Sequence, residues 1–164
     1  MPGPDKAKPQ VRRRGPLRLA FQTWFRLTRG LTLGARAMVR DGEGRILLVR
    51  HTYVPGWAFP GGGVERGETA EEALAHELRD EAGVVLTARP RLFALYANNA
   101  TFPGDHIAFY LVEPGTWERI DWKPNREIAE ARFFPPDALP DDLTPGTARR
   151  IAEVLGGNPP AAEW

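Results

Sequence analysis

The distribution of apolar residues along the chain predicts a series of short strands. Mostly apolar runs bounded by Gly, Pro, Asn or Asp are typical of strands. Such runs cover residues 33–39, 46–50, 84–86, 91–97, 106–112 and 131–135, and a shorter apolar run at 57–60 leads into three consecutive glycines. The turn sequence at residues 41–44 separates the first two runs, which predicts a β-hairpin there.

Helical spacing of apolar residues marks three further segments. Residues 69–82 are predicted as a helix, with Glu68 and Thr69 near its start and Gly83 at its end, and residues 145–155 as a closing helix. Residues 17–28 predict an amphipathic helix that packs on the domain or on a second subunit, with contact to a membrane surface as the alternative. Since strands and helices interleave without a regular βαβ repeat, the fold class is α+β, a mixed sheet covered by helices.

The chain length and local composition predict a single domain with short flanking segments. A chain of 164 residues fits one domain with its own hydrophobic core. Residues 1–16 are rich in Pro, Gly, Lys and Arg and contain one large apolar side chain besides Met1, which predicts a disordered basic tail. We therefore expect one domain over residues 17–156 and a C-terminal tail over residues 157–164.

Composition removes some classes of site and points to anionic partners. Without cysteine, the chain has no disulfide, thiolate metal site or cysteine nucleophile. No apolar stretch is long enough for stable membrane insertion and no signal peptide is recognisable, so a cytoplasmic location is expected. Up to residue 50, 12 basic residues face 3 acidic ones, a net +9 that could attract RNA, anionic lipid or polyphosphate. The alternative is a solvated tail followed by an amphipathic helix.

The most informative segment is a glycine-rich run followed by an acidic helix. Residues 61–68 read Gly-Gly-Gly-Val-Glu-Arg-Gly-Glu, and the predicted helix after them carries Glu77, Asp80 and Glu81. These three carboxylates stand at i, i+3 and i+4, so they share one helix face. Their mutual repulsion is relieved by a hard divalent cation, although an acidic face is also typical of a solvated surface.

This segment resembles the signature of the Nudix hydrolase family. The signature is Gly, five residues, Glu, seven residues and then Arg-Glu-hydrophobic-x-Glu-Glu-x-Gly-hydrophobic; here it begins at Gly62, reaches Glu68 and closes over residues 76–84. The match departs at two positions, where His76 replaces Arg and Asp80 replaces Glu. The resemblance implies an α/β/α sandwich with a mixed sheet between helices.

The resemblance also implies metal ligands and a base. Glu77 and Glu81 would bind a catalytic Mg²⁺, for which Mn²⁺ can substitute, with Asp80 and the backbone of Gly62 as further ligands. In the family, a more distant acid often binds a second metal or acts as the base. Glu127 is the candidate and Glu130 its competitor; the alternative for either is an exposed loop acid.

Glu68 and His76 would orient the metal-binding carboxylates. In the family, the arginine at the position of His76 holds neighbouring carboxylates with a forked set of donors. Histidine offers two donors at most, and its neighbours here would be Glu68 and Glu77. The alternative is that His76 only fills space.

Five residues are candidates for substrate binding. Arg50 and His51 end a predicted strand ahead of the glycine run, where cations could meet phosphate; the alternative is that both face solvent. Trp57 and Phe59 could stack on a nucleobase, with core packing as the alternative. His106 begins a predicted strand in a stretch that resembles MutT-type nucleotide-sanitising enzymes, although a turn histidine is the plainer interpretation.

Together these features predict an Mg-dependent hydrolase. Its substrate would be a small molecule, a nucleoside diphosphate linked to another moiety, cut at the pyrophosphate bond. Residues 143–147 lack the asparagine with which MutT-type enzymes recognise an oxidised guanine, which argues against that substrate. The alternatives are an RNA 5′-end pyrophosphohydrolase and a non-catalytic Nudix-fold nucleotide-binding regulator; a homodimer is a further expectation.

Overall fold

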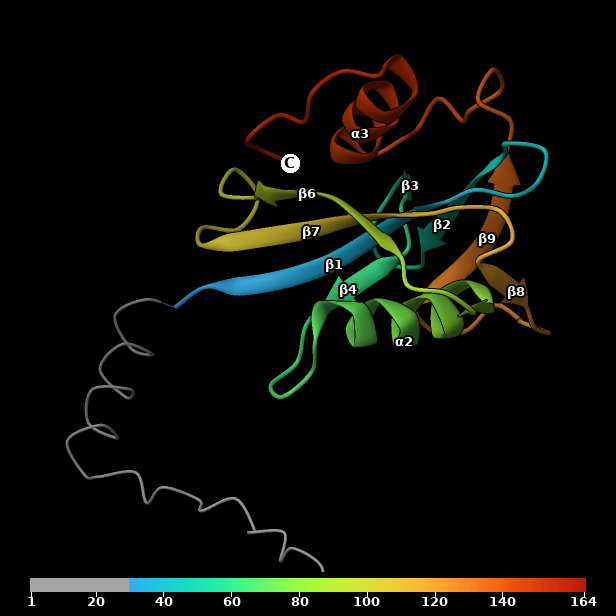
Figure 1. The fold of residues 1–164 in the computed structure, drawn as a ribbon, viewed down its shortest axis with the longest axis horizontal. Helices are drawn as coiled ribbons and strands as arrows, with labels where there is room; N and C mark the ends of the chain where they lie inside the picture. Colours follow the sequence, from blue (N-terminus) through green and yellow to red (C-terminus); the bar gives the residue numbers. More distant parts are fainter. Residues whose placement is uncertain (1–29) are drawn as a thin grey trace, which may run out of the picture. The chain divides into compact units, whose positions relative to one another are not determined.

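The computed structural model describes residues 30–164 (Figure 1). The basic tail and the amphipathic helix predicted before Gly30 lie outside these residues. The elements are β1 Thr32–Val39, β2 Ile46–His51, β3 Trp57–Ala58, β4 Gly61–Gly63, α2 Ala70–Ala82, β5 Val84–Leu86, β6 Arg91–Ala97, β7 Asp105–Val112, β8 Trp117–Arg119, β9 Ile128–Phe134 and α3 Pro145–Gly156. Every strand and helix predicted within this range is present, and β4 and β8 are additional.

The strands form three small sheets that lie between the helices α2 and α3 (Figure 1). The largest sheet has the order β4-β1-β7-β6, in which β1 and β7 are parallel and the other neighbours antiparallel. The second has the order β3-β2-β9, and the third pairs β5 with β8. A mixed sheet between helices confirms the predicted α+β sandwich.

The hairpin predicted between β1 and β2 is wrong. Asp41 does close a turn, because its side chain accepts hydrogen bonds from the N–H groups of Glu43 and Arg45. Beyond a single bridge between Arg40 and Ile46, however, the two strands separate into different sheets. The reason is that a strand has two edges: β1 uses both for β4 and β7, and β2 uses both for β3 and β9.

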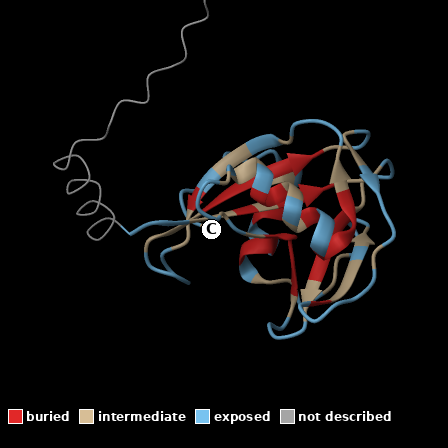
Figure 2. Ribbon diagram, turned by 90° about the horizontal axis from the view of Figure 1, so that it is seen from below, coloured by how far each residue is buried: buried red, intermediate tan, exposed pale blue. Residues whose placement is uncertain are grey.

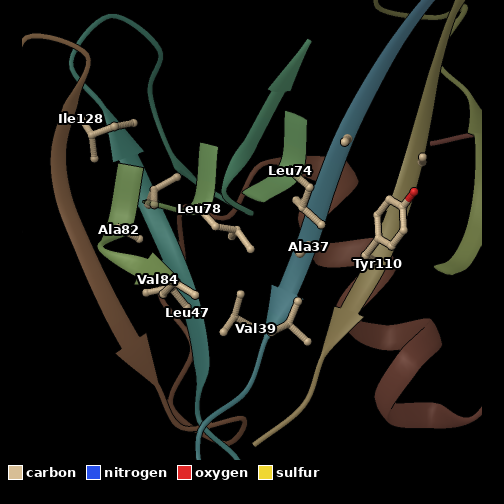
Figure 3. Packing of buried hydrophobic residues seen from close by; sticks show 13 residues of the cluster. Ala37, Val39, Leu47, Leu74, Leu78, Ala82, Val84, Tyr110 and Ile128 are labelled. Carbon is tan, nitrogen blue, oxygen red and sulfur yellow. The ribbon is translucent and has the colours of Figure 1, made fainter. Parts of the chain in front are cut away.

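Side chains that alternate along β1 divide the interior into two cores. Ala35, Ala37 and Val39 face α2 and pack in a mainly aliphatic cluster with Leu74 and Leu78. Figure 3 shows the α2 side chains directed towards the strands of this cluster. Because Leu74 and Leu78 are fully buried, replacing either by Ala should cost about 2–5 kcal/mol.

The second core lies on the α3 side of the sheet and is richer in aromatic residues. It contains Phe59, Tyr96 and Phe109 together with Ile151 of α3. The rings of Phe59 and Phe109 lie 4.9 Å apart at a tilted angle, and Trp164 meets Phe109 edge to face. Figure 2 shows the buried strand segments gathered in the interior, with exposed residues in loops and on the outer sides of the helices.

Both ends of α2 are defined by local interactions. Thr69 is the N-cap and forms a capping box with Glu72, in which the Glu72 N–H donates to the Thr69 hydroxyl and the Thr69 N–H to the Glu72 carboxylate. Gly83 ends the helix in the left-handed region at φ 64°, and a Cβ there would lie 2.7 Å from Cβ of Trp122. These caps fix the length of α2 and hence the direction of its carboxylates.

The segment after α3, predicted as a tail, packs against the sheet. The Trp164 N–H donates to the Ala97 carbonyl at 2.8 Å, and the Ala97 N–H donates to the Ala162 carbonyl at 2.9 Å. The fully buried Arg150 donates to the Glu163 carbonyl and to the Glu153 carboxylate. We call residues 162–164 the C-terminal strap.

Candidate active site

The glycine run forms a strand that lies directly against β1. In β4, Gly61 pairs with Arg36 and Gly62 with Ala35 in antiparallel register. Gly61 has φ 138°, and a Cβ at this position would lie 2.1 Å from the Ala35 carbonyl oxygen. Only glycine allows this approach, which places the Gly61 N–H beside α2.

Glu77 rests on the backbone of Gly62. A Cβ on Gly62 would lie 2.2 Å from Oε1 of Glu77, so any side chain there would displace this carboxylate. Burial raises the pKa of Glu77, and the negative charges of Asp80 and Glu127 raise it further. The structure therefore gives a steric reason for Gly62, while metal binding by its backbone stays a prediction.

Glu81 is the most buried carboxylate of the site. The residue is 7% exposed, and Oε2 accepts a hydrogen bond of 2.8 Å from the Gly61 N–H. Burial raises the pKa of Glu81 to about 7 against the opposing effect of that hydrogen bond, and the charges of Glu77 and Glu127 add to the increase. A cation among these carboxylates would favour their ionised forms.

Glu127 joins the two helix carboxylates, and its competitor does not. Glu77, Glu81 and Glu127 all line one cleft of about 560 Å³. The loop before β9 is held in place because the Asn125 side chain accepts from the Glu127 N–H. Glu130 instead lies near Arg50 and Arg132, at 4.0 Å and 3.8 Å, and is absent from the cleft lining. The geometry favours Glu127 as the distal acid.

Asp80 lies beside this group without lining the cleft. Its side chain is exposed, and its carbonyl accepts from the Trp122 and Asn125 side chains. Between residues 30 and 164, no three His, Asp or Glu side chains are close enough together to enclose a metal. Magnesium commonly takes one or two carboxylates and completes its shell with water and substrate phosphate oxygens. The cleft carboxylates fit such a partly open site, and a ligand role for Asp80 stays a prediction.

Of the predicted substrate-binding residues, the structure brings His51 to the cleft and Arg50 to a neighbouring hollow. Arg50 donates to Asp142 at 2.9 Å, packs over the Trp57 ring and lines a separate hollow of about 370 Å³. His51 lines the cleft, with Nε2 3.9 Å from Oε1 of Glu81. Burial and the nearby Arg36 charge lower the pKa of His51, which favours its neutral form.

The stacking prediction for Trp57 and Phe59 and the binding prediction for His106 are not supported. Trp57 is 3% exposed and Phe59 fully buried, so both belong to the aromatic core, which was the alternative. Ile107 lines the cleft, and because adjacent strand residues face opposite sides, His106 points away from it. The alternation of residues along a strand defines its two faces, but which face lines the cleft depends on how the strand packs in the fold.

Several cleft residues escaped the sequence-based prediction, among them Arg36, Trp164 and Thr147. Arg36 lines the cleft from the middle of β1, and its signal was a lone charge within an apolar run. Trp164 lines the cleft from the C-terminal strap, and no local pattern marks it. Thr147 also lines the cleft, and its hydroxyl accepts from the Phe59 N–H at 3.3 Å.

His76 contacts Glu68. Nδ1 of His76 lies 2.8 Å from Oε1 of Glu68, and the other oxygen of Glu68 accepts from the Glu65 N–H. Among residues 30–164, the His76 side chain forms its hydrogen bond with Glu68 and none with the Glu77 side chain. His76 therefore connects the loop before α2 to the helix, and its side chain is 72% exposed.

An α+β sandwich with a glycine strand and helix carboxylates at one cleft defines a class of hydrolases that act on phosphoanhydrides. The sequence-family model of the NUDIX domain matches residues 30–154. The chain therefore belongs to the NUDIX family and is a hydrolase of this class. No helix among residues 30–164 has the length and apolar character needed to cross a membrane.

Relatives that are named for different substrates are similar to this domain. The 8-oxo-dGTP diphosphatase of Escherichia coli (strain K12) is 42% identical over 95 residues, 54% of this chain and 69% of that protein. The ADP-ribose pyrophosphatase of Methanocaldococcus jannaschii is 33% identical over 106 residues, 61% of this chain and 60% of that protein. The MutT NUDIX hydrolase structure from Burkholderia pseudomallei superposes with a TM-score of 0.60 at 26% identity, covering 75% of this chain and 97% of that chain.

Proposed function

We propose that this protein hydrolyses, with Mg²⁺, the pyrophosphate bond of a nucleoside diphosphate linked to another moiety. The observation that carries the proposal is the meeting of Glu77, Glu81 and Glu127 at one cleft, beside the backbone of Gly61 and Gly62. The volume of about 560 Å³ suits a small-molecule ligand. Relatives named for 8-oxo-dGTP and for ADP-ribose support a nucleotide substrate without choosing one.

The carboxylates divide into two roles in the proposed reaction. Glu77 and Glu81 would hold the magnesium ion, which when bound would offset phosphate charge and make water easier to deprotonate. The Gly61 N–H holds one oxygen of Glu81, which keeps the carboxylate in a fixed orientation. Glu127, on the loop before β9, accepts the proton of the attacking water. Catalysis of this kind depends on positioning and charge stabilisation.

A hydrolysis screen tests the proposal. Nucleoside triphosphates, nucleotide sugars, dinucleotides and capped or triphosphorylated RNA would each be incubated with Mg²⁺, with Mn²⁺ and with a chelator. We expect release of a nucleoside monophosphate or diphosphate from at least one small substrate, and no release with chelator. A protein that binds nucleotides and hydrolyses none of them would be the non-catalytic regulator.

A pair of variants tests the assignment of the distal acid. Glu127→Gln should reduce turnover strongly, whereas Glu130→Gln should not, since Glu130 lies outside the cleft. The opposite result would transfer the role to Glu130. Three expectations stay predictions: the RNA substrate, the homodimer and the cytoplasmic location. Much of the basic charge that suggested an RNA substrate lies before residue 30.

A further inference from the structure

Arg36 is a charged side chain in an otherwise apolar strand. Its neighbours in β1, Ala35 and Ala37, are fully buried and face α2. By alternation, Arg36 faces the other side of the sheet, together with Gly34 and Met38, and its side chain lines the cleft of the carboxylates. Burying a charged side chain in such a strand is costly unless the charge has a partner, so the presence of Arg36 calls for an explanation.

The guanidinium of Arg36 uses little of its hydrogen-bonding capacity within the protein. Nη1 donates to the Phe59 carbonyl at 3.0 Å, whereas a guanidinium has five N–H donors. No carboxylate between residues 30 and 164 lies within ion-pair distance of it. The arginines Arg50 and Arg150 each have a carboxylate within 3 Å, at 2.9 Å and 2.7 Å.

Two of the acidic groups whose charges act on Arg36 already have other partners, Glu81 and Asp105. Glu81 and Glu77 stabilise its charge from a distance, and so does Asp105. Glu81 accepts from the Gly61 N–H, and Asp105 accepts from the side chains of Thr32 and Asn98. Burial lowers the pKa of Arg36, but an arginine keeps its charge in proteins. Its remaining donors are therefore available to whatever occupies the cleft.

We infer that Arg36 binds an anionic phosphate oxygen of the substrate in the carboxylate cleft. The inference rests on the proposed function, because it assumes that the bound molecule carries phosphates. A planar guanidinium suits phosphate oxygens because it can donate two parallel hydrogen bonds. A fixed positive charge also offsets the repulsion that Glu77, Glu81 and Glu127 exert on an anionic substrate. The competing explanation is that Arg36 only neutralises those carboxylates.

Equilibrium binding separates the two explanations. The probes are methylene-bridged analogues of ADP, GDP, CDP and UDP, which cannot be cut at the bridge, and the matching nucleosides. Calorimetry in Mg²⁺ would compare wild type with Arg36→Gln, Arg36→Lys and the control Arg40→Gln. Arg40 directly follows the same strand, lies outside the cleft and pairs with Glu113. Circular dichroism and thermal melting would show that the variants fold.

For the best-bound analogue, Arg36→Gln should weaken affinity at least about tenfold, as expected when a charged hydrogen bond is lost. Affinity for the nucleoside should change by less than about twofold, and Arg36→Lys should lie between wild type and Arg36→Gln, since it keeps the charge without the fork. Arg40→Gln should match wild type. Unchanged analogue affinity in Arg36→Gln, equal losses for analogue and nucleoside, or no analogue binding by wild type would overturn the inference.

Metal binding gives the second readout. A role limited to neutralisation predicts that Arg36→Gln alters Mn²⁺ affinity, measured without nucleotide, and that Arg36→Lys, which keeps the charge, binds the analogue as tightly as wild type. We expect the Mn²⁺ affinity to stay within about threefold, because Arg36 forms no ion pair with Glu77 or Glu81. If wild type hydrolyses a substrate and Arg36→Gln has the same KM, the inference about Arg36 fails and the proposed function stands. If no substrate is hydrolysed but Arg36→Gln still weakens binding of the analogue, the proposed function fails and phosphate binding by Arg36 stands.

Discussion

The two sides of the sheet differ in how the sequence builds them. The α2 side is mainly aliphatic, and the helix carboxylates and the glycines beside them come from residues 61–84. The α3 side is richer in aromatic residues and joins Tyr96 and Phe109 to the distant Trp164. Small residues on the α2 side allow the backbone of Gly61 and Gly62 to approach the helix carboxylates closely.

This difference separates the proposed chemistry from the rest of the cleft wall. The carboxylates of the proposed chemistry come from a contiguous motif and from one loop acid, Glu127. The remaining wall includes Ile107, Thr147 and Trp164, from β7, α3 and the C-terminal strap. We therefore expect substitutions on the α2 side to stop turnover and those on the α3 side to change stability or substrate affinity.

The largest effect is expected from the helix carboxylates. Glu77→Gln and Glu81→Gln should each lower kcat at least about a hundredfold while the fold is retained, because each removes a charged oxygen ligand. Glu71→Gln is the matched control on α2; Glu71 pairs with Arg89 and lies outside the cleft. Steady-state rates in Mg²⁺ and circular dichroism would be measured. Near-normal rates with unchanged metal dependence in both variants would contradict the assignment.

The pH dependence of stability should reveal the burial of Glu81. Its pKa rises from 4.5 to about 7 on folding, so between these values the folded protein binds more protons than the unfolded chain. Without metal, the contribution of Glu81 to stability should therefore fall by about 3 kcal/mol as the pH rises from 4.5 to beyond 7.

Urea unfolding at pH 5 and pH 8 would measure this change, with Glu81→Gln as the comparison. The lowered pKa of His51 has the opposite effect, because it reduces stability as the pH falls. Because Glu81→Gln retains His51, the difference between the two proteins isolates Glu81. Mg²⁺ should stabilise wild type more at pH 8 than at pH 5. Equal slopes for wild type and Glu81→Gln would exclude a raised pKa of Glu81.

Removing the C-terminal strap's aromatic ring should weaken the α3 side. Trp164→Ala should destabilise the protein by about 2 kcal/mol, less than a fully buried Trp would, because this ring is partly exposed. Trp164→Phe should recover most of the loss through edge-to-face packing on Phe109. Phe102→Ala is the control, since Phe102 is 57% exposed. A melting temperature for Trp164→Ala equal to that of the control would show that the strap does not stabilise the fold.

Two neighbouring glycines allow a smaller, more local test of the α2 side. Gly62→Ala should lower kcat about tenfold, because the new methyl group displaces Glu77 and misplaced catalytic groups are costly. Gly63→Ala is the matched control, since a Cβ there meets no atom within 4 Å. Rates would be compared at saturating Mg²⁺. Equal rates for the two variants would mean that Glu77 does not need its contact with Gly62.

The smallest effect is expected at His76. Because its side chain is 72% exposed and contacts Glu68 instead of a cleft carboxylate, His76→Gln should change kcat/KM by less than about threefold. Rates for wild type, His76→Gln and His76→Arg would be measured from pH 6 to pH 9, and parallel profiles are expected. A large loss in His76→Gln would restore the orienting role that the family resemblance implied.

Sequence reasoning predicted the local features of the fold and part of the site. The limits of α2, its caps and the shared face of Glu77 and Glu81 follow from spacing over a few residues, so they are visible in the chain itself. Glu127 was identified only as one of two candidates, because both acids precede the predicted strand at residues 131–135, and the structure extends that strand back to Ile128 and so includes Glu130. The exclusion of Trp57 and His106 from the cleft depended on burial and on strand orientation.

The sequence by itself determined most of the strands, the helices α2 and α3, and which carboxylates could bind a cation. Tertiary structure decided that β1 pairs with β7 and not with β2, that Arg36 faces the cleft and that Trp164 helps to line it. The physical reason is that periodicity expresses local backbone geometry, whereas strand partners are chosen by burial across long separations in sequence. A lone arginine in an apolar strand was visible beforehand, but its direction required the sheet.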